Sequence, residues 1–108
     1  MADKKTIMLV CSAGMSTSLL VSKMQKASEA QGLDTEIFAT AASDADNALA
    51  TKNPDILMLG PQVRYLLGQF QKKVNNIPVE VINMQDYGMM NGEKVLKEAV
   101  TSIDNFQK

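Results

Sequence analysis

The chain of 108 residues contains no histidine and no tryptophan, and it has a single cysteine, Cys11. Histidine is the commonest general base and metal ligand in proteins, so its absence excludes a Cys–His or Ser–His catalytic pair and argues against a zinc site. One thiol cannot form an internal disulfide or a Cys-x-x-Cys redox pair. Any nucleophile in this chain therefore has to work without a base from the same chain.

Neither sign of charge is in excess, because eleven basic residues face twelve acidic ones and the net charge is −1. The basic residues form no cluster larger than pairs such as Lys4-Lys5 and Lys72-Lys73, so we expect no nucleic-acid partner. The apolar runs are strand-sized, far shorter than the roughly 20 residues that cross a membrane, and no signal peptide opens the chain. We expect one soluble, cytoplasmic domain over residues 1–108 that acts on something brought by a partner.

Four short apolar segments alternate with segments of helical length and composition. The predicted strands are residues 7–10, 36–39, 56–59 and 79–82. The predicted helices are residues 17–31, a short helix capped by Ser43-Asp44 that runs through Ala50, a helix from Pro61 to Asn75-Asn76, and a helix after the Asn91-Gly92 turn. Because crossovers between parallel strands are right-handed, this alternation predicts a three-layer α/β fold with a four-stranded parallel sheet in the order 2-1-3-4 and helices on both faces.

Apolar residues at helical spacing predict which helix faces are buried. In the first helix these are Leu19, Leu20, Met24, Ala27 and Ala30. In the third helix they are Val63, Leu66, Leu67 and Phe70, and in the last helix they are Val95, Leu96, Ala99, Val100, Ile103 and Phe106.

Cys11 directly follows the first predicted strand, and a loop of small residues, Ser-Ala-Gly-Met-Ser-Thr-Ser, leads from it into the first helix. The unpaired backbone N–H groups of a helix N-terminus stabilise negative charge, either on the sulfur or on a phosphoryl group attached to it. Hydroxyl groups of Ser12, Ser16, Thr17 and Ser18 add donors, and Gly14 permits tight curvature. The pattern indicates a nucleophile in a phosphate-binding loop, and a buried structural cysteine is the alternative.

The loop differs from the common nucleotide-binding loops, because no Gly-Lys-Ser/Thr follows it and it has only one glycine. Cysteine phosphatases use Cys-x5-Arg-Ser/Thr, in which the arginine clamps the transferring phosphoryl group. Thr17 stands at the position of that arginine. Because such a clamp is worth about 10³-fold or more in rate, a phosphocysteine here is expected to hydrolyse slowly, as a carrier requires.

The residues match a known family at four places. They are Cys11-Ser12-Ala13-Gly14-Met15-Ser16-Thr17-Ser18-Leu19-Leu20, Leu59-Gly60-Pro61-Gln62, Pro78-Val79-Glu80-Val81-Ile82 and Tyr87-Gly88. The chain resembles the IIB component of the phosphoenolpyruvate-dependent sugar phosphotransferase system (PTS), in the lactose/cellobiose/chitobiose family, and looks most like the cellobiose type. The resemblance covers the chain almost end to end.

This resemblance implies that Cys11 accepts a phosphoryl group from a histidine of the IIA component and passes it to a sugar bound by the membrane component IIC. It implies a fold similar to that of low-molecular-weight tyrosine phosphatases, no metal or organic cofactor, and a cytoplasmic protein that meets the membrane through IIC. The implied phosphate-binding residues are Ser12, Ala13, Gly14, Met15, Ser16, Thr17 and Ser18. The residues Gly60, Pro61, Gln62 and Tyr87 are expected at the rim, although a Gly-Pro pair also simply turns a strand into a helix.

Two other functions stay open. In a low-molecular-weight cysteine phosphatase-like hydrolase, Asp86 would be a general acid beside Tyr87, whereas the alternative is that Asp86 only begins a polar turn before Asn91-Gly92. In a non-catalytic interaction module, methionines would form an adaptable binding surface, whereas methionine at such spacings is otherwise core filler. The methionines concerned are Met15, Met84, Met89 and Met90.

Overall fold

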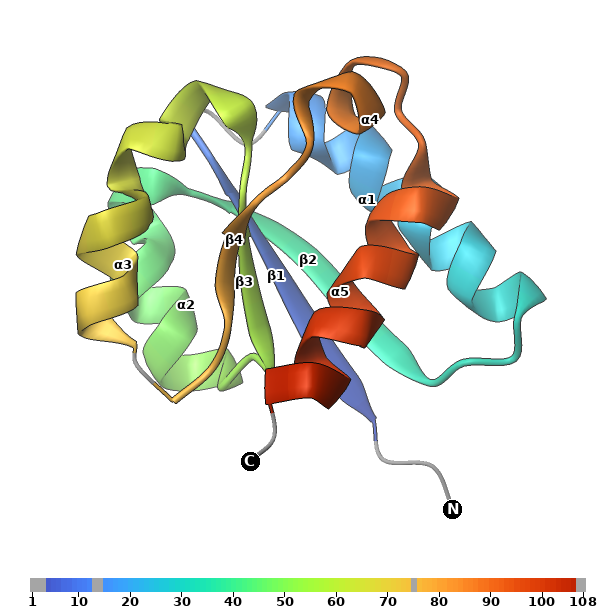
Figure 1. Ribbon diagram of the computed structural model, residues 1–108, viewed down its shortest axis with the longest axis horizontal. Helices are drawn as coiled ribbons and strands as arrows, with labels where there is room; N and C mark the ends of the chain where they lie inside the picture. The colour runs from blue at the N-terminus through green and yellow to red at the C-terminus, as the bar shows by residue number, and fades with distance from the viewer. Residues whose placement is uncertain (1–3, 13–14, 75, 107–108) are drawn as a thin grey trace.

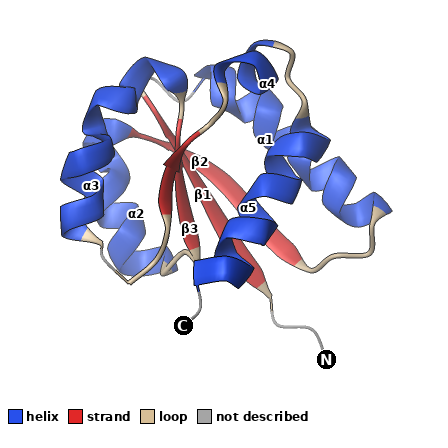
Figure 2. Ribbon diagram, viewed as in Figure 1, coloured by secondary structure: helices blue, strands red, loops and turns tan. Residues whose placement is uncertain are grey.

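The computed structural model describes residues 4–12, 15–74 and 76–106, with the backbone alone for residues 15–17. Its centre is a parallel sheet of four strands in the order β2-β1-β3-β4 (Figures 1 and 2). The strands are β1 (Lys5–Cys11), β2 (Thr35–Ala41), β3 (Ile56–Leu59) and β4 (Val79–Val81). The predicted fold class is confirmed, since each predicted strand is present and the order is the one expected.

Helices cover both faces of the sheet. They are α1 (Met15–Ala30), the 3₁₀ turn η1 (Ala42–Asp44), α2 (Ala45–Lys52), the 3₁₀ helix η2 (Pro61–Leu66), α3 (Leu67–Lys73), α4 (Met84–Gly88) and α5 (Gly92–Phe106). Figure 1 shows α1 and α5 on one side of the sheet and α2 and α3 on the other. Because successive strand residues point to opposite faces, Ile7 and Leu9 pack under α1 and α5, whereas Met8 and Val10 pack under α2 and α3. The result is the predicted three-layer arrangement.

The predicted buried face of α1 is wrong at both ends. Leu19 is 54% exposed and Ala30 is exposed, whereas Leu20, Met24 and Ser28 are fully buried at a spacing of one helical turn. Ser28 can be buried because its hydroxyl shares a hydrogen bond of 2.7 Å with the Thr35 hydroxyl. The face was misjudged because hydropathy alone does not reveal a polar residue whose hydrogen bond is made to another element.

The other helices follow the prediction with three corrections. The Asp44 side chain makes no capping hydrogen bond at the start of α2, which instead continues from the turn η1. The helix expected from Pro61 begins as 3₁₀ because Val63 leaves helical geometry, with φ −117° and ψ 24°. Phe106, at the end of the α5 stripe, is 44% exposed and lies in the last turn of the helix.

The segment after β4, for which the sequence pattern predicts no helix, forms the short helix α4 (Met84–Gly88). The Asn83 side chain starts this helix, because its Oδ1 accepts hydrogen bonds from the backbone N–H groups of Gln85, at 2.9 Å, and Asp86, at 3.2 Å. Five residues are too few for a helical period to show in the sequence. No helix in the described ranges is long and apolar enough to cross a membrane.

Candidate functional site

Cys11 is the last residue of β1, a central strand of the sheet, and its side chain is 1% exposed. The neighbouring strand β3 ends at Leu59, and Gly60 follows it with its N–H bonded to the Val10 carbonyl at 2.8 Å. A Cβ atom at Gly60 would lie 3.6 Å from the Cβ of Cys11. The turn after β3 therefore lies directly against the cysteine, as expected for the carboxyl ends of adjacent parallel strands.

The predicted phosphate-binding residues lie between Cys11 and the first turns of α1. Ala13 and Gly14 lie outside the described residues, as do the side chains of Met15, Ser16 and Thr17. Ser12 and Ser18 are described, and both are exposed. Because α1 begins at Met15, the positive end of its dipole is close along the chain to Cys11. The anion-binding loop itself stays a prediction, since most of it lies outside the described residues.

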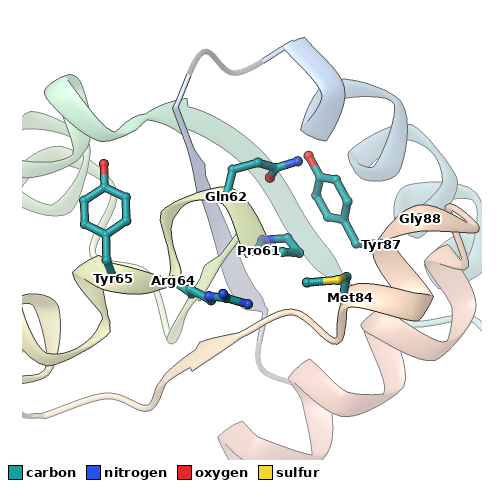
Figure 3. A pocket seen from close by; sticks show the side chains of 7 residues that line it. All are labelled: Pro61, Gln62, Arg64, Tyr65, Met84, Tyr87 and Gly88. Atoms are coloured by element: carbon teal, nitrogen blue, oxygen red, sulfur yellow. The ribbon is translucent and has the colours of Figure 1, made fainter.

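A groove of about 790 Å³ runs between η2 and α4, next to the turn that touches Cys11. It is lined by Pro61, Gln62, Arg64, Tyr65, Met84, Tyr87 and Gly88. In Figure 3 the Gln62 amide and the Tyr87 hydroxyl point toward one another, and Arg64 extends from η2 toward Met84. Three of the four expected rim residues thus line one groove, whereas Gly60 lies behind them against the cysteine.

Sequence reasoning missed Arg64, Tyr65, Met84 and Gly88 as groove residues. No sequence pattern pointed to them, because the groove depends on how η2 packs beside α4, an element distant in the chain.

The interpretation of the methionines as core filler is wrong at two positions, Met84 and Met89. Met84 is 62% exposed and Met89 is 67% exposed, and Tyr65 beside the groove is 76% exposed. Met90, in contrast, packs against the core under α1 and α5. The surface on both sides of the groove therefore presents apolar and aromatic side chains to solvent.

Asp86 is buried inside α4, with 5% of its surface exposed, and it does not line the groove formed by the described residues. Its Oδ1 lies 3.9 Å from Nζ of Lys94, and its Oδ2 has no hydrogen-bond partner among the described residues. Its backbone carbonyl accepts a hydrogen bond from Asn91 at 2.9 Å. The interpretation that Asp86 only begins a polar turn before Asn91-Gly92 is therefore wrong, since Asp86 lies within α4, and its burial does not present it to a leaving group.

Comparison with known proteins identifies the family. The family model described as "PTS system, Lactose/Cellobiose specific IIB subunit" matches residues 6–98. The chain belongs to this family of IIB components. The described part of this IIB component contains no group of His, Cys, Asp and Glu side chains that could hold a metal ion.

Relatives of this IIB component carry several sugar names. It is 57% identical over 104 residues to a galactose-specific EIIB component of Lactococcus lactis subsp. cremoris (strain MG1363). The matched region covers 92% of this chain and 95% of the relative. Identity and coverage are the same for a cellobiose-specific EIIB component of Lactococcus lactis subsp. lactis (strain IL1403). An oligo-beta-mannoside-specific EIIB component of Bacillus subtilis (strain 168) is 40% identical, over 94% of this chain and 98% of the relative.

Solved structures agree with the fold of this IIB component. The cellobiose-specific phosphotransferase IIB component of Borrelia burgdorferi matches with a TM-score of 0.79 and 36% identity, over 97% of this chain and 96% of that one. The lactose-specific IIB domain of Streptococcus pneumoniae matches with a TM-score of 0.78 over 93% of this chain and 98% of that one, at 13% identity, which bears on the fold alone. The predicted resemblance to the lactose/cellobiose IIB family is confirmed.

Proposed function

We propose that this IIB component is a phosphocarrier in which Cys11 accepts a phosphoryl group from a histidine of IIA and delivers it to a sugar bound by IIC. The chain is then a protein-cysteine phosphotransferase. The observation that carries the proposal is the place of its only cysteine, at the end of a central strand and between Gly60 and the N-terminus of α1. Membership of a sugar phosphotransferase family supports it.

Two displacements at phosphorus make up the proposed reaction. In the first, the Cys11 sulfur forms an S–P bond while the N–P bond of the phosphohistidine breaks, and the electron pair stays on the imidazole nitrogen of IIA. In the second, a sugar hydroxyl oxygen attacks phosphorus, the S–P bond breaks, and the thiolate is regenerated. The hydroxyl proton leaves to solvent or to the partner, since this chain has no histidine to take it.

The loop after Cys11 has the task of holding the phosphoryl oxygens between the two steps. Backbone N–H groups of residues 12–18, hydroxyl groups of Ser12, Ser16, Thr17 and Ser18, and the dipole of α1 supply donors and positive potential. Such donors stabilise charge during transfer without any metal or organic cofactor. Because the Cys11 side chain is 1% exposed, the sulfur has to become accessible when a partner docks.

For the sugar we propose cellobiose or a related β-linked disaccharide. A cellobiose-specific relative at 57% identity supports this choice, but a galactose-specific relative is equally similar. In the proposed mechanism the carrier meets only the acceptor hydroxyl, so IIC selects the sugar. The protein would act in the cytoplasm and meet the membrane through IIC.

The test is the intact mass of the protein after incubation with phosphoenolpyruvate and the general phosphotransferase proteins, with and without IIA. We expect one phosphoryl group on the wild type, only when IIA is present, and none on Cys11→Ser. Circular dichroism would show that the variant is folded. A folded Cys11→Ser protein that still gains a phosphoryl group from IIA would contradict the assignment of Cys11.

A further inference from the structure

The groove beside Cys11 contains the only arginine of the chain, Arg64. The groove-lining residues of the described structure include no aspartate or glutamate. Arg64 is exposed, and each ion pair recorded among the described residues uses a lysine instead. The guanidinium of Arg64 is therefore a charge that no acidic group of the described chain neutralises.

This charge lines the groove that adjoins the turn against Cys11. Gly60 touches Cys11, and its missing side chain would also lie 3.2 Å from the Gln62 Oε1, so one continuous turn connects Cys11 to the wall of the groove. Arg64 follows Pro61 by three residues in η2 and extends toward Met84 (Figure 3). Arg64 is thus the cationic side chain that lines the groove next to the turn against Cys11.

The two partners of the proposed reaction differ in the charge that they bring. A phosphorylated donor carries about −1.5 to −2 on its phosphoryl group near pH 7, whereas a sugar hydroxyl is neutral. Arginine is the side chain best suited to a phosphoryl group, because its planar guanidinium donates two parallel hydrogen bonds. The net charge of this chain, −1, offers such a donor no long-range attraction.

We propose that Arg64 is a specificity-determining residue that binds the phosphoryl group of the phosphorylated donor as it enters the groove. Arg64 thereby selects phosphorylated IIA over unphosphorylated IIA. This inference rests on the proposed function of the chain as a phosphocarrier. Arg64 forms and breaks no covalent bond, so it affects capture of the donor and leaves the delivery of the phosphoryl group to the sugar largely unchanged.

The first experiment measures the rate of phosphoryl transfer from phosphorylated IIA to this chain in single turnovers. Arg64→Ala is expected to lower kcat/KM for the donor by about tenfold or more, and Arg64→Lys to restore part of it because the charge returns without the planar fork. The matched control is Lys72→Ala, which removes an exposed cation on α3 that has no recorded ion pair. Thermal unfolding would show whether each variant is folded.

The second experiment separates the phosphoryl group from the rest of the donor. Binding of phosphorylated and unphosphorylated IIA is compared in a Cys11→Ser background, in which transfer is blocked. We expect Arg64→Ala to remove most of the preference for phosphorylated IIA. If Arg64→Ala weakens the binding of phosphorylated and unphosphorylated IIA equally, the proposal is overturned, because Arg64 would then contact a group that both forms of IIA share.

The outcomes distinguish this inference from the proposed function. If Arg64→Ala slows loading but reaches the same final phosphorylation of Cys11, both stand. The proposed role of Arg64 is refuted if Lys72→Ala slows loading as much as Arg64→Ala does. It is also refuted if Arg64→Ala slows delivery to the sugar as much as loading. In both cases Cys11 keeps its role as the phosphoryl acceptor. If IIA never phosphorylates Cys11 in the wild type, the proposed function itself fails.

Discussion

Gly92, the first residue of α5, lies directly against the backbone of Met24 in α1. A Cβ atom at Gly92 would come within 2.6 Å of the Met24 nitrogen and of the Lys23 carbonyl carbon. Gly92 and Met24 are both buried. Together with Leu96 they lie in the helical layer that α1 and α5 form on one face of the sheet. Close approach of the two helices therefore depends on the missing side chain.

Gly92→Ala is expected to destabilise the protein by about 1–3 kcal/mol, because backbone atoms of α1 cannot rotate away from a methyl group as a flexible side chain would. Urea unfolding would measure the change. Gly68 is the matched control, since it is also helical but a Cβ atom there would meet nothing within 4 Å. Gly68→Ala is expected to leave stability unchanged or raise it by about 0.4–1 kcal/mol. A tolerated Gly92→Ala would contradict the close packing of the two helices.

Asp86→Asn is expected to stabilise the protein, because it removes a buried negative charge whose Oδ2 has no partner among the described residues while keeping the shape. Its nearest cation, Lys94, is 3.9 Å away and 60% exposed, which compensates the buried charge poorly. The control is Asp104→Asn, which alters a pair of similar length, 4.0 Å to Lys5, on a carboxylate that is 65% exposed. That variant is expected to change stability by no more than about 0.5 kcal/mol. A loss of stability in Asp86→Asn alone would show that the Lys94 pair is net favourable.

The ionisation of Glu36 makes the stability of the protein depend on pH, and the sign of this dependence follows from its neighbours. The hydrogen bond and charge of Lys52, whose Nζ lies 2.8 Å from Oε2, and the charge of Lys4 at 3.7 Å lower the pKa of Glu36 below its usual value of 4.5. Because the pKa is lower in the folded state, the stabilisation is present above that value and is lost as the pH falls through the folded-state pKa.

Glu36→Gln is therefore expected to reduce stability at pH 7 by a small, salt-sensitive amount and to match the wild type near pH 3. Urea midpoints at the two pH values would measure this. The control is Glu29→Gln, which alters an exposed carboxylate on α1. Its urea midpoint is not expected to move toward that of the wild type as the pH falls. A Glu36 effect that is equally large at both pH values would contradict the electrostatic origin.

Wild-type protein without partners is expected to show negligible turnover of an aryl phosphate. Thr17 occupies the position of the arginine that clamps the phosphoryl group in cysteine phosphatases, and the buried Asp86 does not face the groove. The measurement is release of the phenol at high protein concentration, with Cys11→Ser as the blank. Robust turnover that depends on Cys11 would reject the carrier and favour the hydrolase.

Local pattern and chain connectivity explain why the sheet was predictable. Ile56–Leu59 is a run of four fully buried residues, and the structure reproduces the predicted bounds of that strand. Right-handed crossovers then leave few strand orders, and the order 2-1-3-4 places Cys11 beside the turn at Gly60. These features depend on neighbours in the sequence and on one general rule of handedness.

The sequence by itself thus determined the strands, their order and the place of its only cysteine. Tertiary structure alone decided the burial of Asp86 and Ser28, the exposure of Leu19 and Met84, and the position of Arg64 in the groove. Each of these depends on how different elements pack together, such as α4 with α5 or η2 with α4, and not on the pattern within one element. Hydropathy reports what a side chain prefers, whereas burial and site geometry depend on which partners the fold brings within a few ångströms.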